Sequence, residues 1–229
     1  MQIIAEIGQN HNGDINLAKE LISSAKQNGA DVVKFQIYNA KKLFSKKNNP
    51  WYKNNVRSEL SEEQIIDLNE YCKKTQIEFM ASVFDIDLIK ITEKIDMRRY
   101  KIASRSINDK LLLSKIFKLN KPLIISLGYW KKPYLPFQNK KNQIDYLYCV
   151  SKYPAKTKDI KLSKKLFKKV SGFSDHTIGI KSAIKAIKCG AKIIEKHFTM
   201  NKKFEGPDHI LSMTPNELKE LSKYKQYNI

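Results

Sequence analysis

Residues 191–200, with the sequence AKIIEKHFTM, place three ionisable side chains at the end of an apolar run. Two isoleucines are typical of a buried strand, and Glu195, Lys196 and His197 follow them directly. Ionisable groups are costly to bury unless they are paired, hydrogen-bonded or bound to a metal. The sequence therefore predicts a polar site at the end of this strand.

A second apolar segment, GFSDH at residues 172–176, ends in a histidine in the same way. If the two segments are neighbouring strands, His176 and His197 come within the few ångströms that a shared metal requires. Two imidazoles leave coordination positions open, which suits a divalent cation such as Mn²⁺ or Zn²⁺. Glu195 lies on the same strand face as His197 and is a candidate ligand or supporting partner. Taken alone, His11 and His209 are better interpreted as hydrogen-bonded packing residues.

Two lysines, Lys34 and Lys101, each interrupt an otherwise apolar strand-like run. Lysines at exposed strand tips would be the simpler interpretation, but four serines also follow predicted strands: Ser82, Ser104, Ser126 and Ser174. Ammonium and hydroxyl groups together are suited to a phosphate dianion. The pattern predicts a pocket for a small phosphorylated and carboxylated molecule beside the metal. Other strands end in further polar groups, namely Glu6, Gln36, Ser151 and Tyr153.

The elements that must position these groups alternate along the whole chain. Strand-like segments are expected at 2–8, 30–38, 78–84, 98–104, 121–128, 144–150, 172–176 and 192–198, with amphipathic helical segments between most of them. Repeated strand–helix units predict a parallel sheet, and eight of them most simply close into an α/β (β/α)₈ TIM barrel. The carboxyl ends of the strands would then gather all of these polar groups at one mouth. The alternative of an open doubly wound sheet is disfavoured, because EIGQNHNGD has the wrong spacing for a dinucleotide turn.

The segment 129–143, YWKKPYLPFQNKKNQ, contains two prolines and no helical periodicity. It predicts a reduced fifth helix, replaced by a loop or a single turn. The 229 residues as a whole are expected to form a single barrel domain spanning 1–229.

Composition narrows the class of partner. The net charge of +20 is typical of proteins that bind nucleic acid, but only four of the 43 basic residues are arginine and the lysines are dispersed along the sequence. Nucleic-acid binding is therefore disfavoured, while an anionic small substrate would be attracted. There is no long apolar run and no basic leader, which predicts a cytoplasmic protein without a membrane partner. The three cysteines are expected to be reduced packing residues.

Seven motifs resemble one known family. These are IIAEIGQNHNGDINLAKELISSAKQNGADVVKFQ, FDIDLI, YKIAS, VSKYPA, GFSDHTIGI, GAKIIEKHFT and GPDH, which run in order from residue 3 to about 220. They are similar to the N-acetylneuraminate (sialic acid) synthases and their legionaminate and pseudaminate synthase relatives. The resemblance implies a barrel enzyme that condenses phosphoenolpyruvate with an N-acetylmannosamine-like amino-sugar aldose and releases phosphate.

The resemblance also assigns roles by position. His176 and His197 correspond to the metal ligands, and the implied cofactor is a divalent metal, with Mn²⁺ the first choice and Mg²⁺, Co²⁺ and Zn²⁺ left open. Phosphoenolpyruvate is expected at Lys34, Ser82, Lys101, Ser104, Ser126, Ser151 and Ser174, where Ser151 replaces the usual asparagine. The sugar is expected at Glu6, Gln36, Tyr153 and Asp208.

Two departures from the family pattern stand out. The usual KIASGE reads KIASRS here, so Ser106 replaces a catalytic acid and Arg105 replaces a small residue. We interpret Arg105, with Glu6 and Asp208, as a candidate catalytic residue. Family members usually form homodimers and continue into an antifreeze-like domain, which this chain is expected to lack or to find in a separate partner protein. A catalytically silent sugar- or phosphate-binding barrel and a metal-dependent aldolase or hydrolase therefore remain open alternatives.

Overall fold

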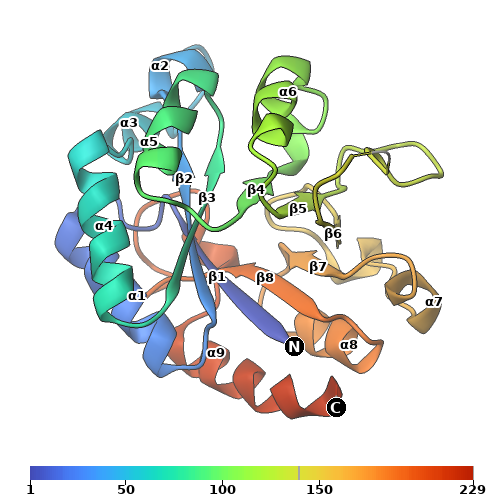
Figure 1. The fold of residues 1–229 in the computed structure, drawn as a ribbon. Helices are drawn as coiled ribbons and strands as arrows, with labels where there is room; N and C mark the ends of the chain where they lie inside the picture. The colour runs from blue at the N-terminus through green and yellow to red at the C-terminus, as the bar shows by residue number, and fades with distance from the viewer. Residues whose placement is uncertain (139, 229) are drawn as a thin grey trace.

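The computed structural model describes residues 1–138 and 140–228, in which eight parallel strands close into a barrel (Figure 1). The strands are β1 (Gln2–Gly8), β2 (Val32–Ile37), β3 (Glu78–Val83), β4 (Tyr100–Ile102), β5 (Leu123–Ser126), β6 (Ile144–Cys149), β7 (Gly172–Asp175) and β8 (Ile193–His197). Each strand pairs with the next along the chain, and β8 pairs with β1. The predicted (β/α)₈ TIM barrel is confirmed.

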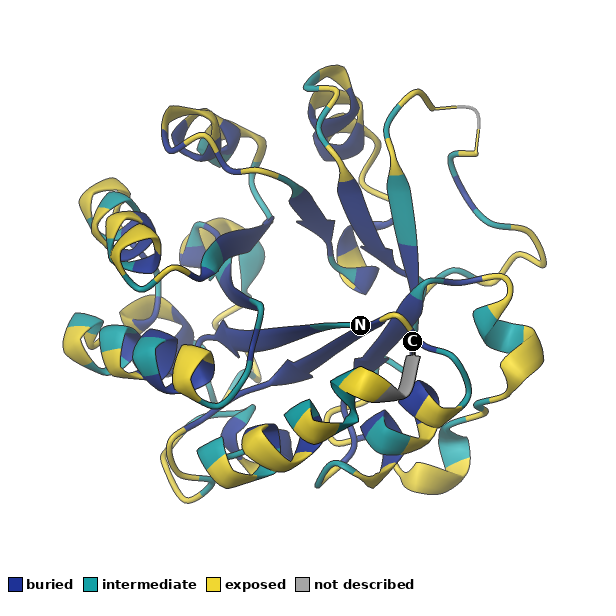
Figure 2. Cartoon of the chain, turned by 60° about the horizontal axis from the view of Figure 1, so that its bottom comes forward, coloured by how far each residue is buried: buried dark blue, intermediate teal, exposed yellow. Residues whose placement is uncertain are grey.

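The strands are apolar on both faces, as strands covered by helices must be. One set of side chains packs outward against the helices and forms the larger part of the core. A second, smaller apolar cluster consists of Ile4, Val32, Met80, Ile124, Leu147 and Ile193, which come from six different strands. Figure 2 shows the buried strands surrounded by helices whose outer faces are exposed. The smaller cluster fills the barrel interior below the polar residues described in the next subsection.

Nine α-helices lie in the described ranges: α1 (Ile15–Gln27), α2 (Ala40–Leu43), α3 (Tyr52–Arg57), α4 (Glu62–Lys74), α5 (Ile89–Lys94), α6 (Lys110–Lys118), α7 (Lys164–Phe167), α8 (Lys181–Lys188) and α9 (Pro215–Ser222). Helix α4 begins where the sequence predicts, because Ser61 and Gln64 form a reciprocal capping box. None of the described helices is long and apolar enough to cross a membrane.

Two short helices were not expected from the sequence. Helices α2 and α3 lie in the long connection between β2 and α4, where no apolar periodicity marks them. Asn39 caps α2 through its side chain, and the buried Asn54 and Asn55 on α3 make polar contacts instead of apolar ones. A pattern search for hydrophobic faces misses helices that are held by hydrogen bonds.

The reduced fifth helix is confirmed. Between β5 and β6, residues 127–138 and 140–143 contain no helix, and the segment projects as a loop beside α6 (Figure 1). The Tyr146 hydroxyl donates a hydrogen bond to the Pro136 carbonyl and fixes the loop to β6. The barrel is therefore covered by a loop where a regular (β/α)₈ fold has a helix.

Candidate active site

Every side chain that the sequence singles out for the site lines one of two cavities at the barrel mouth. The inner cavity, of about 50 Å³, is lined by Glu6, Lys34, Gln36, Ser82, Lys101, Ser104, Ser126, Tyr153, Ser174, His176 and His197. The outer cavity, of about 520 Å³, is lined by Gln36, Ser104, Arg105, Ser151, Tyr153, His197 and Asp208. The two cavities share several of these residues and form one funnel.

The alternation of strand side chains explains this convergence. In β8, Ile193 belongs to the apolar interior cluster, so Glu195 and His197 also face inward, two and four residues later. In β2, Val32 belongs to the same interior cluster, so Lys34, two residues later, also faces inward. Six of the strands therefore contribute an apolar residue to the floor, and the polar residues lie above it.

Two lysines and two carboxylates form a buried charge cluster at the bottom of the inner cavity. The Lys34 Nζ lies 2.7 Å from Glu6 Oε2 and 3.8 Å from Glu195 Oε2. The Lys101 Nζ lies 3.5 Å from Glu195 Oε1. All four side chains are buried, so their attraction is weakly screened. Opposite charges face each other in this cluster, so that although burial alone would lower the pKa of Lys34, the charges on Glu195 and Glu6 raise it. Burial lowers the pKa of Lys101 below its ordinary value, although Glu195 opposes this shift.

Serine hydroxyls complete the inner cavity. Lys34 donates to Ser82 Oγ at 3.1 Å, and Lys101 donates to Ser126 Oγ at 2.7 Å. Ser174 donates to Glu195 Oε1 at 2.8 Å. These contacts orient both ammonium groups toward the same small space, and donors of this kind favour an anion with several oxygens.

The pKa values of the cluster follow from burial and charge. Burial alone would raise the pKa of Glu195, but the ammonium groups of Lys101 and Lys34 hold it at about 2. Burial is the main reason that the pKa of Glu6 is raised, and the charge on Glu195 adds to it, although Lys34 opposes both. Glu195 is therefore the anion that anchors the lysines, whereas Glu6 is closer to taking up a proton.

The two predicted metal-binding histidines lie side by side. The rings of His176 and His197 have centroids 5.9 Å apart, and the Tyr153 ring lies 4.2 Å from the His176 ring, tilted by 35°. His176 Nδ1 lies 3.0 Å from the Val150 carbonyl oxygen, which only accepts hydrogen bonds. The Nδ1 proton is thus the one that faces this carbonyl, and Nε2 carries the lone pair when the ring is neutral. Burial would lower the pKa of His176, but contact with the Cys149 thiol and the Val150 carbonyl raises it, so a ligand at Nε2 has to compete with a proton.

The chemistry of this histidine pair fits a divalent cation. His197 Nδ1 is buried without a hydrogen-bond partner, and Asp208 Oδ2 lies 3.9 Å from it. Burial lowers the pKa of His197 to about 4, so its imidazole is neutral and available as a ligand near neutral pH. Bonds of about 2 Å from each imidazole to one ion are compatible with the ring separation. The described residues contain no group of three or more His, Cys, Asp and Glu side chains that could hold an ion.

The outer cavity carries the residues predicted to contact the second substrate. Gln36 Nε2 donates to Glu6 Oε1 at 3.1 Å and links the outer cavity to the inner one. Tyr153 is 53% exposed and stands at the mouth, where a substrate can cover it. The guanidinium of Arg105 lies 5.6 Å from the Phe44 ring and 5.8 Å from the Phe84 ring.

Arg105 and Ser106 differ in their relation to the site. Arg105 is exposed and lines the outer cavity, held between two aromatic rings. Ser106 is buried, and it is not among the described residues that line either cavity. The position at which the sequence lacks the expected carboxylate therefore lies behind the cavity wall, while its neighbour faces the cavity.

Several residues in or beside the two cavities were not predicted from the sequence, among them Cys149 and Gly128. Cys149, expected only to pack, lines the inner cavity, with its Sγ 3.5 Å from Ser104 Oγ. It lies two residues after Leu147 of the interior cluster, so strand alternation could have identified it. Gly128 donates its N–H to Ser104 Oγ at 3.1 Å, and a Cβ there would come within 2.1 Å of Ser151 Oγ. Only the folded structure shows that Gly128 and Ser151 lie so close together.

Comparison with known proteins places the chain among related sequences. The family model described as the NeuB family matches residues 21–227. The chain belongs to the NeuB family. It is 40% identical to an uncharacterised protein of Methanocaldococcus jannaschii, over 96% of this chain and 68% of that protein. It is 37% identical to the N,N'-diacetyllegionaminic acid synthase of Campylobacter jejuni, over 96% of this chain and 73% of that enzyme.

A solved structure agrees with the family assignment. The N-acetylneuraminic acid (sialic acid) synthetase of Leptospira borgpetersenii superposes with a TM-score of 0.89 at 32% identity, covering 99% of this chain and 82% of that one. The predicted resemblance to the sialic-acid-type synthases is thus confirmed at the level of the NeuB family, and the chain is classed with enzymes.

Proposed function

We propose that the chain condenses phosphoenolpyruvate with an open-chain N-acetylmannosamine-like amino-sugar aldose, giving a nonulosonic acid and inorganic phosphate. The observation that carries this proposal is the arrangement of two buried ammonium groups, Lys34 and Lys101, directly beside the histidine pair. Membership of the NeuB family and the similarity to a legionaminic acid synthase support the same reaction class.

One anionic end of phosphoenolpyruvate is assigned to the inner cavity, and the rest of the molecule to the adjoining part of the outer cavity, because a volume of about 50 Å³ is too small for the whole molecule. Its phosphate and carboxylate are anionic, and Lys34, Lys101 and the serine hydroxyls donate into the same space. Entry of the ligand would bring more negative charge next to Glu195, which the two lysines already neutralise. Ser151 and Ser104, on the rim shared with Gly128, would hold the outer oxygens. The aldose would occupy the outer cavity against Tyr153.

The proposed reaction conserves all atoms and charge. The methylene carbon of phosphoenolpyruvate attacks the aldehyde carbon, a C–C bond forms, and the aldehyde oxygen takes up a proton. Water adds to the carbon that bears the phosphate, where positive charge develops, and releases one proton, which balances the proton taken up by the aldehyde oxygen. The C–O bond to the phosphorus-bound oxygen then breaks, the remaining hydroxyl proton leaves with inorganic phosphate, and the carbon becomes a ketone. A divalent metal held by His176 and His197 would act as a Lewis acid toward the aldehyde oxygen.

This chain's own residues would supply orientation and the proton. Burial raises the pKa of Glu6 above its ordinary value, which brings this carboxyl closer to taking up and donating a proton. Glu6 is oriented by Gln36 and by Lys34 at 2.7 Å, so it keeps a fixed position at the junction of the two cavities. We assign to Glu6 the acid–base role that Ser106 cannot perform. Asp208, in the outer cavity near His197, would hold sugar hydroxyls.

Arg105 is proposed to bind an anionic or carbonyl group of the sugar. Its guanidinium faces the outer cavity and is held by Phe44 and Phe84, so little side-chain freedom is left to lose on binding. Arg105→Ala is expected to raise the KM for the aldose and leave the KM for phosphoenolpyruvate unchanged. An unchanged KM for both substrates would remove Arg105 from the site.

The test of the reaction is phosphate release from phosphoenolpyruvate with N-acetylmannosamine and Mn²⁺, and mass spectrometry of the product. His176→Ala and His197→Ala are each expected to lower Mn²⁺ affinity by about 10- to 100-fold or more, measured by calorimetry without substrate. His11→Asn serves as the matched control, since His11 lies outside both described cavity linings. Equal Mn²⁺ affinity in all three variants would rule out the histidine pair as the metal site.

The alternative is a silent barrel that binds the ligands without turnover, which the absence of a carboxylate at Ser106 favours. The Ser106→Glu variant distinguishes an active synthase from a silent barrel. Because Ser106 is buried behind the cavity wall, a synthase that relies on Glu6 should lose stability and gain no activity from this change. A silent chain that gains phosphate release on Ser106→Glu would instead be a synthase that has lost its acid.

A further inference from the structure

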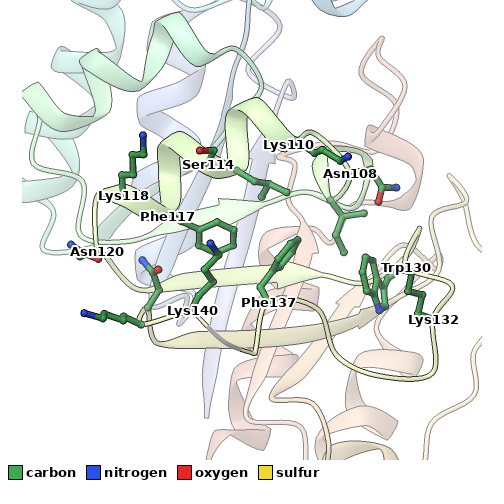
Figure 3. Close-up of a pocket in the computed structure, with 14 residues that line it drawn as sticks. Asn108, Lys110, Ser114, Phe117, Lys118, Asn120, Trp130, Lys132, Phe137 and Lys140 are labelled. Atoms are coloured by element: carbon green, nitrogen blue, oxygen red, sulfur yellow. The ribbon is translucent and has the colours of Figure 1, made fainter.

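A third cavity lies on the outside of the barrel, away from the active site. It has a volume of about 650 Å³ and is lined by α6 on one side and by the β5–β6 segment on the other (Figure 3). None of its described lining residues also lines the inner or the outer cavity. We call it the lateral groove. It occupies the place where a regular barrel has its fifth helix.

The floor of the lateral groove is a row of three aromatic rings. The centroids of Phe117 and Phe137 are 5.1 Å apart, and those of Phe137 and Trp130 are 6.2 Å apart. Figure 3 shows the three rings side by side along the groove. Each step is close to the 5.4 Å pitch of an α-helix. The row is therefore spaced to receive side chains from successive turns of a helix.

The rings are held in place before any ligand binds. Phe137 has a φ of +60°, a left-handed conformation that is unfavourable for a bulky residue. The neighbouring Pro136 carbonyl accepts a hydrogen bond from the buried Tyr146 hydroxyl, and Trp130 Nε1 donates to the Tyr134 carbonyl at 2.6 Å. Trp130 and Phe137 nevertheless stay partly exposed. A strained residue that holds an aromatic ring toward an open groove indicates a binding surface.

The rim of the lateral groove is strongly basic. Its lysines are Lys110, Lys118, Lys132, Lys140 and Lys141, all exposed, and no aspartate or glutamate is among the described lining residues. The chain has 23 acidic residues against 43 basic ones, so five lysines would on average be accompanied by about two or three carboxylates. Lys132 Nζ already lies 5.4 Å above Trp130, and Lys140 Nζ lies 5.1 Å from Phe117. These ammonium groups have no anionic partner among the groove residues that the structure describes.

We infer that the lateral groove binds an acidic amphipathic helix of another protein, which takes the place of the absent fifth helix. The aromatic row would receive the apolar face of that helix, and the lysine rim would pair with its carboxylates. A second copy of this chain docked groove to groove fits less well, because two lysine rims would then face each other with no aspartate or glutamate among their described lining residues. This inference does not depend on the reaction proposed above.

The test uses the full chain and a fluorescent peptide of about 14 residues, long enough for three to four helical turns. The peptide carries leucine and phenylalanine at every third or fourth position and glutamate elsewhere, and a matched peptide replaces each glutamate with lysine. The acidic peptide is expected to bind at least tenfold more tightly than the basic one, measured by fluorescence anisotropy at two salt concentrations. Absence of saturable binding by the acidic peptide would overturn the inference.

Charge reversal locates the binding site. The double variant Lys132→Glu/Lys140→Glu should weaken acidic-peptide binding about tenfold, since two rim attractions become repulsions. The control Lys164→Glu/Lys165→Glu makes the same charge change on exposed positions of α7 and should alter binding less than twofold. If both double variants weakened acidic-peptide binding equally, the peptide would be responding to the net charge of the chain alone, and the lateral groove would be refuted as the binding site.

Two further measurements test the aromatic row and the identity of the occupant. Trp130→Ala should weaken binding of the acidic peptide, whereas unchanged binding would exclude the aromatic row. A dimer of this chain that dissociates in the Lys132→Glu/Lys140→Glu variant would identify a second copy as the occupant. Both lysines are exposed, so their reversal leaves the fold intact and keeps the test valid if Trp130→Ala does not fold.

Discussion

Removing the Lys101 ammonium tests whether the buried charge cluster holds both the fold and the ligand. Lys101 Nζ lies 3.5 Å from Glu195 Oε1, and both side chains are buried. At an effective dielectric constant of about 20, this separation corresponds to an attraction of about 5 kcal/mol. Lys101→Met keeps the side-chain volume but leaves the Glu195 carboxylate with only the more distant Lys34. Stranding a buried charge in this way is expected to cost about 3–5 kcal/mol of unfolding free energy.

The double variant Lys101→Met/Glu195→Gln separates stability from binding. It removes both charges, so the unfolding free energy should return to within about 1–2 kcal/mol of the wild-type value. Phosphoenolpyruvate binding should not return, because one of the two ammonium donors is still missing. The loss of binding free energy is expected to be about 1.5–3 kcal/mol, the range for hydrogen bonds to charged groups.

Urea unfolding near neutral pH measures the stability of each variant, and calorimetry with phosphoenolpyruvate measures binding. The exposed pair of Lys73 and Glu70, whose charged atoms are 2.7 Å apart, provides the matched control through Lys73→Met/Glu70→Gln. Its coupling energy should be no more than about 0.5 kcal/mol, since exposed pairs are screened. If the buried pair shows no greater coupling than this control, or if the double variant binds phosphoenolpyruvate like the wild type, the reasoning is refuted.

Three further outcomes are expected. Burial lowers the pKa of His11 to about 4, below its ordinary 6.5. The stability that its neutral ring contributes is therefore present above pH 6.5 and is lost as the pH falls toward 4. His11→Asn should remove about 3 kcal/mol of this pH dependence of the unfolding free energy, measured in urea. Gly128→Ala should weaken phosphoenolpyruvate binding, because its Cβ would lie 2.1 Å from the Ser151 hydroxyl, 2.8 Å from the Ser104 hydroxyl and 3.0 Å from the Cys149 sulfur, and all three side chains would have to shift; unaltered affinity would exclude this rim from the site. Gly172→Ala should destabilise the barrel by about 1–3 kcal/mol or more in the same unfolding assay, since its Cβ would lie 2.1 Å from the Ile193 carbonyl oxygen of the neighbouring strand; a neutral result would mean that β7 and β8 can separate there.

Much of the fold and of the candidate site could be predicted from local patterns. Strand alternation determines which side chains share a face, so the period of two by itself groups His197 with Glu195 and Lys34 with Gln36. A parallel barrel then collects the carboxyl ends of all strands at one mouth. For this reason the predicted site residues on the strands line the inner cavity, whereas Arg105 and Asp208 reach the outer cavity from the turns and loops that follow the strands.

Other features depend on contacts between distant parts of the chain. The pairing of Lys101 on β4 with Glu195 on β8 crosses the barrel interior, and only closure of the barrel sets that distance. The burial of Ser106 beside the exposed Arg105 depends on a short turn whose direction no periodicity encodes.

Local residue patterns were enough to specify the (β/α)₈ architecture, the loop in place of the fifth helix and the polar residue types that gather at the barrel mouth, because periodicity and strand-end residue types are properties of short segments. Only the folded chain brings Phe117 on α6 against Phe137 on the β5–β6 segment to form the lateral groove. Folding also selects which carboxylate balances each buried lysine. The physical reason is that distances between elements arise from packing and chain closure, which no single stretch of sequence contains.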